Sequence, residues 1–485
     1  MVKNRKKNKR KTPAKQAIQP SHPGANKIEA NTPYDFSGKN LTPYGGLLPV
    51  GAMLEKLGFE QLVEEWIRSS RITRAMSPYQ FVLGIVLSFY VGFQRLNQIR
   101  FIARDPALTG IVKVGQLPPQ STLWRFLAAL HGTVGVQILK IQQRMRERVW
   151  AAANVKLTVG TLDTDTTVHT LYGDQMGARK SYNPKNKGKK SYQPILTFLA
   201  ETREYVMGSL HNGDRPTGKQ IADHLRSAFA ALPECVQTIR ARADSGFYCW
   251  EAIEAYLEQA NCWFIVVARK TSRLVEELKR AKWKPSPETD ADAECEFRYQ
   301  PDGWGKECRF VALRYESKRE KVKVGETEQY QLFATAEFTY RVFVTNLAEP
   351  IAEAVWLYNQ RAGAENLIKE ANNDAGLAAH PSKRFDVNCV HFQMVMLAYN
   401  LNCWLMLLNR EPEVDVDSFK HTTLATSRLR FLFIAAKIWK HSRRTGIRYS
   451  NHYEEQGTFN RLMDRIRAIK KQGETFAAVM KPALE

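Results

Sequence analysis

The spacing of apolar positions changes along the chain and divides it into regions. Between residues 50 and 150, apolar residues recur every three or four positions, which predicts helices. Beyond this region the apolar residues alternate with polar ones or form short runs, which predicts strands. Helix-spaced segments separate the later strands, so the predicted order is βββαβαβ and the predicted class is α/β. The predicted strands cover residues 155–165, 191–200, 204–210, 238–244 and 262–269.

The second half of the chain departs from this alternation. Residues 270–338 combine a charged, helix-like segment with a hairpin-like segment, which predicts a β-rich insertion. A strand at 340–347 and a helix at 352–372 are expected next. Beyond residue 386 the chain is expected to be helical and basic.

One helix of the first region, within residues 117–130, has two different faces. Ser121 is expected to cap it, and four apolar residues form a single stripe. Trp124 and Arg125 then point elsewhere, with a size and charge suited to a DNA groove. An ordinary amphipathic helix in a bundle has the same pattern. The stripe consists of Leu123, Phe126, Leu127 and Leu130.

Composition and charge narrow the functional classes. The chain has 71 Lys+Arg against 49 Asp+Glu, a net charge of +22, which favours a polyanionic partner such as nucleic acid over a membrane. Residues 1–15 hold eight of these cations and no acid, as a nucleic-acid arm or a solubilising tail would. The seven cysteines form no Cys-x-x-Cys pair, so neither a zinc site nor a disulfide framework is expected. No secretory segment or membrane span is expected.

A pair of carboxylates marks the first predicted strand. Asp163 and Asp165 are two residues apart in TLDTDTT, so their side chains leave the same face of an extended backbone. No lysine lies beside them to relieve their repulsion, and Mg²⁺ or Mn²⁺ would do so. Asp244 ends the strand TIRARAD, at the kind of strand end where α/β sheets hold ligands.

A segment at 213–220, GDRPTGKQ, is close to a phosphate-binding loop. Gln220 stands where Ser or Thr would ligate Mg²⁺, and Asp214 places negative charge inside the anion site. A tight turn that caps the following helix is the favoured interpretation. The alternative, a nucleotide-hydrolysing enzyme, predicts that Lys219→Ala abolishes ATP hydrolysis.

The predicted helix at 352–372 places four polar residues on one face, namely Tyr358, Arg361, Glu365 and Lys369. A solvated stripe would have the same pattern. Gly363 in the middle of the helix costs about 1 kcal/mol relative to Ala, which suggests close approach by another group.

Three segments in this order, LDTDTT, RADSGFY and YNQRAGAENLIKE, resemble the DDE transposases of bacterial insertion sequences. The resemblance is to the group with the signature Tyr, two residues, Arg, three residues, Glu, six residues, Lys. Tyr358, Arg361 and Glu365 match it, whereas Asn372 stands in place of the final Lys. The resemblance extends over about 40–450.

This resemblance implies an RNase H-like mixed sheet with a β-rich insertion, flanked by an N-terminal helical DNA-binding region and a C-terminal helical region. It assigns Asp165, Asp244 and Glu365 as the catalytic acids and as the ligands of two Mg²⁺ ions, with Mn²⁺ as the alternative metal. Asp163 becomes a second-shell residue or an alternate ligand. The expected regions are 1–35 (basic arm), 36–150 (DNA-binding helices), 151–269 and 339–385 (catalytic core), 270–338 (insertion) and 386–485 (basic helical region).

The implied function is metal-dependent DNA cleavage at terminal inverted repeats and strand transfer into target DNA, by a homodimer in the bacterial cytoplasm at the nucleoid. The alternative is a catalytically silent DNA-binding protein derived from a transposase. Trp304 is expected either to stack on a flipped base or to lie in the core of the insertion. The histidines show no ligand spacing. The residues expected to contact DNA are Tyr358, Arg361, Lys369, Lys185, Lys187, Lys189, Lys190 and Arg125.

Overall fold

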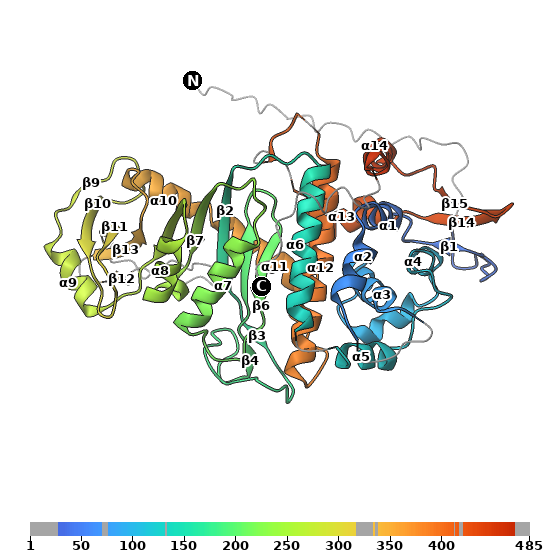
Figure 1. Ribbon diagram of the computed structural model, residues 1–485, viewed down its shortest axis with the longest axis horizontal. Helices are drawn as coiled ribbons and strands as arrows, with labels where there is room; N and C mark the ends of the chain where they lie inside the picture. The colour runs from blue at the N-terminus through green and yellow to red at the C-terminus, as the bar shows by residue number, and fades with distance from the viewer. Residues whose placement is uncertain are drawn as a thin grey trace, which may run out of the picture. The chain divides into compact units, whose positions relative to one another are not determined.

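The computed structural model describes residues 28–69, 76–130, 133–316, 333–334, 338–411, 413–416 and 421–470 (Figure 1). The chain divides into two compact units, Met1–Lys39 and Asn40–Glu485. Most of the predicted basic arm, residues 1–27, lies outside the described residues. All elements below belong to the second unit.

The first region is helical, as the periodicity predicts. Local capping signals set several boundaries: Ser77 and Gln80 form a capping box at the start of α3, and Asp105 accepts the N–H groups of Ala107 and Leu108 at the start of α4. The helices are α1 (Leu47–Lys56), α2 (Phe59–Trp66), α3 (Pro78–Tyr90), α4 (Pro106–Val112), α5 (Gln120–Ala128) and α6 (Val134–Ala152), with a 3-10 helix, η1 (Leu96–Phe101), between α3 and α4.

Helix α5 confirms the predicted stripe but not the predicted cap. Leu123, Phe126 and Leu127 are buried, whereas Trp124 and Arg125 are exposed. The N-cap is Pro119 rather than Ser121, and no side chain caps the helix. Pro119 is extended and directly precedes the first helical residue, Gln120, so the helix starts two residues earlier than a cap at Ser121 predicts.

A large mixed sheet follows, and its first part has the predicted βββαβαβ order. Strands β6, β5 and β2 pair antiparallel, whereas β2, β7 and β8 pair parallel. Helix α7 (Gly218–Ala230) follows β6, and α8 (Trp250–Glu258) follows β7. A separate short pair, β3 (His169–Thr170) with β4 (Ser191–Tyr192), lies between β2 and β5 in the chain. The strands of the first part are β2 (Val159–Thr166), β5 (Ile195–Leu199), β6 (Tyr205–Ser209), β7 (Thr238–Ala243) and β8 (Cys262–Val267).

The segment 270–338 is β-rich, as predicted, and it extends the same sheet. After α9 (Ser272–Arg280) the sheet continues from β8 through β13, β11 and β10 to β9, and β12 pairs with β13. Trp304 is only 8% exposed and packs against Tyr248, Trp250 and Phe310. It is therefore a core residue of the insertion, and its proposed stacking on a flipped base is wrong. These strands are β9 (Lys284–Pro285), β10 (Ala293–Tyr299), β11 (Cys308–Glu316), β12 (Phe333–Ala334) and β13 (Phe338–Thr345).

The chain beyond residue 386 is only partly helical. It contains α12 (Phe385–Asn409), α13 (Leu424–Ser427), a π-helical turn η4 (Arg428–Leu432) and α14 (Gln456–Ala468). The expectation of a helical region is wrong for β14 (Ala436–His441) and β15 (Arg444–Tyr449), which form a hairpin that β1 (Leu41–Thr42) completes to a three-stranded sheet. Its turn places Ser442 and Arg443 at φ of 47° and 62°, without the Gly or Asn that usually signals this conformation.

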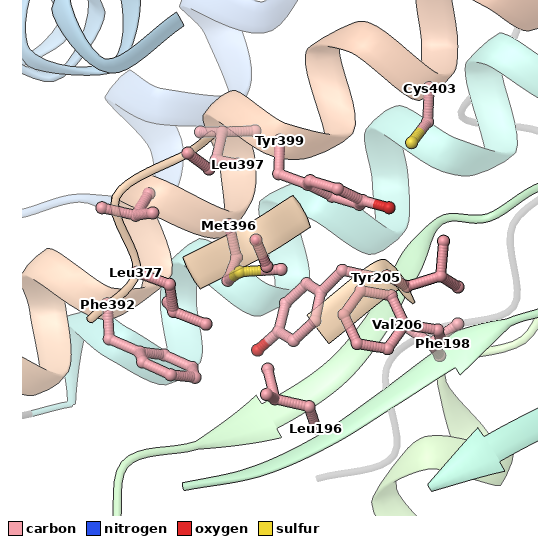
Figure 2. Close-up of a cluster of buried hydrophobic side chains, with 14 of the residues drawn as sticks. Leu196, Phe198, Tyr205, Val206, Leu377, Phe392, Met396, Leu397, Tyr399 and Cys403 are labelled. Atoms are coloured by element: carbon pink, nitrogen blue, oxygen red, sulfur yellow. The ribbon is translucent and has the colours of Figure 1, made fainter. Parts of the chain in front are cut away.

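Helix α12 covers the sheet at β5 and β6 (Figure 2). The ring of Phe198 lies edge-on to Tyr205 and Tyr399, with ring centroids 6.1 and 5.8 Å apart. Met396 and Leu196 belong to the same buried cluster. This apolar contact joins the helical part of the molecule to the sheet.

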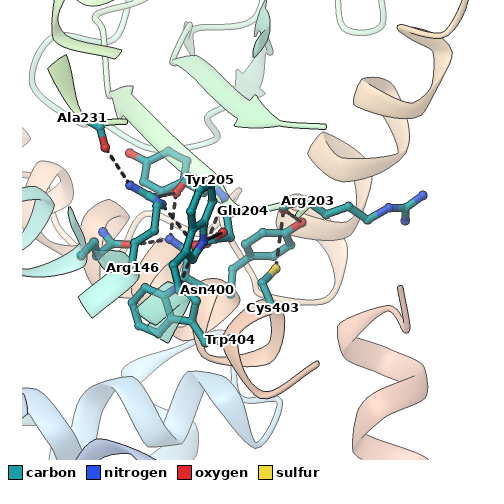
Figure 3. A network of polar contacts seen from close by, with 11 residues as sticks. Arg146, Arg203, Glu204, Tyr205, Ala231, Asn400, Cys403 and Trp404 are labelled. Carbon is teal, nitrogen blue, oxygen red and sulfur yellow. Dashed lines mark hydrogen bonds and ion pairs between the residues drawn. The ribbon is translucent and has the colours of Figure 1, made fainter. Parts of the chain in front are cut away.

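A buried polar network reinforces the same junction (Figure 3). Glu204, in the turn between β5 and β6, accepts from Arg146 of α6 at 3.1 Å and from Trp150 and Trp404 at 2.8 and 2.7 Å. Asn400 of α12 donates to the carbonyl of Tyr205 at 2.8 Å and accepts its N–H at 2.9 Å. Since every polar group named here has a partner, the network is favourable despite its burial. In the described part of the chain, no helix has the length and apolarity to cross a membrane.

Candidate active site

Asp165 and Asp244 meet at one edge of the sheet. Strands β2 and β7 are parallel, and Thr164 pairs with Ala243, so the next residue of each strand is one of these aspartates. Asp165 is 3% exposed and Asp244 is half-buried. The sequence analysis places both aspartates at the ends of predicted strands, 155–165 and 238–244, and both lie near strand ends in the structure.

Asp165 carries a buried carboxylate with two close polar contacts. Its Oδ1 accepts the N–H of Thr166 at 2.7 Å, and its Oδ2 lies 2.8 Å from Nη2 of Arg361. Burial raises the pKa of Asp165 to about 7; the Arg361 guanidinium opposes this shift and the Asp244 carboxylate adds to it. The Asp165 carboxyl therefore holds a proton more readily than an exposed aspartate does.

Asp244 is positioned by the turn that follows β7. Its side chain accepts the N–H of Gly246 at 2.8 Å and caps a short 3-10 turn, η2 (Ser245–Phe247). A Cβ on Gly246 would lie 2.7 Å from Oδ1 of Asp244. Glycine at this position therefore leaves room for the carboxylate to turn back onto the backbone.

Asp163 has a different environment from its neighbour on the strand. Nε and Nη2 of Arg242 contact its two carboxylate oxygens at 2.7 and 2.8 Å, and Nη1 of Arg242 donates to the carbonyl of Leu357 at 2.9 Å. The parallel register places Asp163 beside Arg242 on one face of the sheet. Burial raises the pKa of Asp163, and the Arg242 guanidinium opposes this shift. Both oxygens are thus engaged, and a role as alternate metal ligand would require this ion pair to break.

The predicted helix 352–372 consists of two helices, α10 (Ile351–Asn359) and α11 (Ala362–Asn373), separated at Gln360 and Arg361. This break presents Arg361 at the N-cap of α11, where its guanidinium reaches Asp165 and, at 3.5 Å, the carbonyl of Thr164. Among the described residues, no atom outside the local helix backbone and the two chain neighbours lies within 4 Å of a Cβ placed on Gly363, so close packing against another element does not explain this glycine.

Tyr358 and Arg361 are both buried in this structure. The Tyr358 ring packs on Phe343 with centroids 4.9 Å apart and lies beneath the Arg341 guanidinium at 5.2 Å. Burial raises the pKa of the Tyr358 hydroxyl to about 12. As they stand, the two signature residues contact protein and join α10 and α11 to the sheet.

Glu365 is exposed on α11, one turn beyond Arg361, and Lys369 is exposed one turn further. Within the described residues, no three Asp, Glu, His or Cys side chains are gathered in positions that would hold a metal ion. The structure therefore brings Asp165, Asp244 and Arg361 together, and it does not bring Glu365 into that group.

Asn372, at the position of the signature lysine, is half-buried and makes a contact that the sequence does not reveal. Its Oδ1 lies 2.9 Å from Nε2 of His169, and Nδ1 of His169 lies 3.0 Å from Nε2 of His380. Burial lowers the pKa of His169 to about 4, so this histidine is neutral at physiological pH. Asn372 therefore ties the end of α11 to the segment that follows β2.

The basic loop between β3 and β4 presents cations to solvent. Lys185, Lys187 and Lys189 are exposed, whereas Lys190 is half-buried and pairs with Asp174 at 3.3 Å. The exposed Arg125 folds back onto the carbonyl of Ser121 at 3.0 Å.

The favoured interpretation of 213–220 as a helix-capping turn is confirmed, since Thr217 and Gln220 form a capping box at the start of α7. A Cβ on Gly218 would meet the Glu251 carboxylate at 2.3 Å. This acid lies where a phosphate would have to approach.

The family model for transposase DDE domain group 1 matches residues 25–471. The chain belongs to this transposase family. Membership implies an enzyme of the nuclease and transferase kind, and DDE transposases generally use divalent metal ions. Comparison with curated proteins gave no match. A solved structure, the piggyBac transposase synaptic complex with hairpin DNA, is similar at a TM-score of 0.39 and 11% identity, over 91% of this transposase and 83% of that chain.

Proposed function

We propose that this transposase cleaves DNA at terminal inverted repeats in a metal-dependent reaction and joins the 3′-hydroxyl ends to target DNA. The observation that carries the proposal is the pair Asp165 and Asp244 at the ends of adjacent parallel strands, with Arg361 on Asp165. Phosphodiester chemistry develops negative charge on the attacking and leaving oxygens, and carboxylates at such a position are suited to hold the cations that offset it.

The donor chemistry fits a divalent ion. Asp165 and Asp244 offer hard oxygen ligands. Burial raises the pKa of Asp165 and the neighbouring Asp244 carboxylate adds to this shift, so a cation between the two carboxylates would be favourable. Bound Mg²⁺, with Mn²⁺ as the alternative, would stabilise charge on the reacting oxygens and activate the water or 3′-hydroxyl nucleophile. We assign Asp165 and Asp244 as ligands of two such ions, and we assign Glu365 as the third ligand on its match to the family signature, since it lies exposed outside the aspartate pair in this structure.

The surrounding residues hold the two aspartates in place. Arg361 orients the Asp165 carboxylate and offsets part of its charge, and Asp163 orients Arg242, which bridges to α10 through the Leu357 carbonyl. We assign Asp163 and Arg242 to positioning and not to metal binding. The strand order β6-β5-β2-β7-β8, with three antiparallel strands followed by parallel ones, supports an RNase H-like core.

Double-stranded DNA is the proposed partner, both as transposon ends and as target. The excess of 71 Lys+Arg over 49 Asp+Glu and the exposed lysines 185, 187 and 189 support it. We further propose a homodimer that holds two ends together, and a location at the nucleoid in the bacterial cytoplasm.

The test is cleavage of a labelled duplex that carries the inverted repeat found in the DNA flanking the coding sequence. We expect nicking at the repeat end in Mg²⁺, and its loss in Asp165→Asn, Asp244→Asn and Glu365→Gln while DNA binding persists. Asp223→Asn and Glu353→Gln alter exposed carboxylates on α7 and α10 and serve as matched controls. They should cleave like the wild type.

Two outcomes would count against the proposal. Tight binding without cleavage by the wild type in Mg²⁺ and in Mn²⁺ would favour the catalytically silent DNA-binding protein. Full cleavage by Glu365→Gln, with loss in both aspartate variants, would remove Glu365 from the ligand set and leave the aspartate pair as the metal site.

A further inference from the structure

Strand β1 pairs only with Ala436 and Lys437, so the hairpin β14–β15 extends beyond it as a two-stranded ribbon with one face turned to solvent. Directly paired residues share a face, so Lys437 and Arg448 lie side by side, as do His441 and Arg444. Trp439 lies between these pairs, opposite Gly446. All but Gly446, which is half-buried, are exposed, with Trp439 39% exposed. We call this surface, made of Lys437, Trp439, His441, Arg444 and Arg448, the ribbon face.

The opposite face of the hairpin anchors it to the protein. Tyr449 packs edge-on against Phe459 of α14, with centroids 5.2 Å apart, and its hydroxyl donates to the carbonyl of Gly45 at 3.1 Å. Ala436 is buried beside β1. The hairpin is therefore held by its inner side, and the ribbon face remains open.

The charge of this surface is of one sign. No Asp or Glu occurs between His421 and Tyr453, a stretch that holds seven Lys and Arg residues. Among the described residues, Lys437, Arg444 and Arg448 have no ion-pair partner, whereas Arg430 pairs with Glu455 at 2.5 Å. Unpaired cations on one side of a rigid ribbon are the electrostatic footprint of a polyanion site.

Trp439 gives this surface a flat apolar centre. A Cβ on Gly446 would lie 2.2 Å from the indole ring, so glycine on the neighbouring strand lets the ring lie across the backbone. Such a ring between cations favours contact with sugars or base edges, because it offers apolar area without a charge to desolvate.

We propose that the ribbon face binds double-helical DNA, with the ribbon entering the major groove and Lys437, Arg444 and Arg448 contacting phosphates. The major groove of B-DNA accommodates a two-stranded ribbon, and side chains of one face then reach both strands. The inference rests on the proposed function in one respect, that DNA is the substrate. Helices α6 and α12 lie between the hairpin and the strands that carry Asp165 and Asp244 (Figure 1). The ribbon would therefore bind a part of the DNA duplex that lies away from the phosphodiester bond cleaved at Asp165 and Asp244.

The experiment measures binding of the full chain to a random-sequence duplex without metal, over salt concentrations from about 50 to 200 mM. The variant is Lys437→Gln/Arg444→Gln/Arg448→Gln, which keeps side-chain length. Each phosphate contact contributes about 0.9 to the slope of log affinity against log salt, so the slope should fall by about 2 to 3. Trp439→Ala should weaken binding and leave the slope unchanged.

The control is Lys279→Gln/Arg298→Gln/Lys306→Gln, which removes the same charge from exposed positions around the insertion. A slope equal to that of the wild type in the ribbon variant, or an equal loss in the control, would overturn the proposal. Unchanged DNA binding by the ribbon variant, together with a loss of its binding to anionic lipid vesicles, would also overturn the proposal, because the ribbon face would then be a lipid-binding surface. DNA binding is measured without cleavage, so the ribbon proposal can be tested even if the proposed cleavage reaction does not occur.

Discussion

Nη2 of Arg361 lies 2.8 Å from Oδ2 of Asp165, and this contact joins the start of α11 to the end of β2. Both side chains are buried, and Asp244 lies beside the same carboxylate. Arg361 is thus the protein's own counter-charge to the aspartate pair, at the point where two helices separate.

Replacing Arg361 with lysine should slow DNA cleavage about 10- to 100-fold, because an ammonium cannot reproduce the guanidinium geometry and a charged hydrogen bond is worth about 1.5–3 kcal/mol. The measurement is single-turnover cleavage across a titration of Mg²⁺. Arg226→Lys, at an exposed pair with Glu258, is the control. Wild-type rates in Arg361→Lys would show that the contact is dispensable for the reaction.

Asp163→Asn should destabilise the protein by about 3–5 kcal/mol, because it leaves the buried Arg242 without its counter-ion. Urea unfolding without metal measures this. Asp244→Asn should cost less, since Asp244 is only half-buried. An Asp163→Asn protein that is as stable as the wild type but binds metal weakly would instead make Asp163 a ligand.

Asn372→Lys, which restores the signature residue, should lower stability by about 1–3 kcal/mol and should not raise activity. The lysine removes the hydrogen bond to the buried His169 and places a charge at a half-buried position beside it. Thermal unfolding and the cleavage assay are the measurements, with Lys369→Ala on the exposed face of α11 as the control. Faster cleavage by the Asn372→Lys variant would contradict this account.

Buried His224 should make the protein less stable in acid. Burial lowers its pKa to about 3, whereas an unfolded histidine has a pKa of about 6.5, so the unfolded chain takes up the proton first as pH falls. The contribution of neutral His224 to the free energy of unfolding is fully present above about pH 6.5. Below that pH it decreases by about 1.4 kcal/mol per pH unit. Denaturant unfolding from about pH 7 to 4.5 should show that stability falls less steeply with pH in His224→Gln than in the wild type. Parallel curves of stability against pH for the two proteins would refute this role of His224.

Glu204→Gln should cost about 3–5 kcal/mol, because the buried Arg146 loses its counter-ion and the network between α6, α12 and the sheet loses a charged acceptor. Glu258→Gln, at an exposed ion pair, should cost at most about 1 kcal/mol. Equal effects of the two changes on the urea midpoint would show that burial does not strengthen the Glu204 network.

Much of the fold follows from local pattern. The βββαβαβ order, the apolar stripe of α5 and the capping turn at Thr217 depend on side-chain periodicity and on contacts within a few residues, and the structure confirms each of them. The positions of Asp165 and Asp244 at strand ends follow in the same way. The hairpin β14–β15 could not be predicted from local pattern. Strand pairing imposes the positive φ angles of Ser442 and Arg443, which these residue types do not favour by themselves.

The partners of the charged residues were decided by tertiary structure. The sequence shows two aspartates on one strand without a neighbouring lysine, which suggests that both are metal ligands. The fold matches Asp163 with Arg242 across the parallel register and Asp165 with Arg361 from a helix start far along the chain. Alternation along a strand determines on which face of the sheet a side chain lies. The oppositely charged residue that it contacts depends on strand register and helix placement, and packing of the whole core sets both.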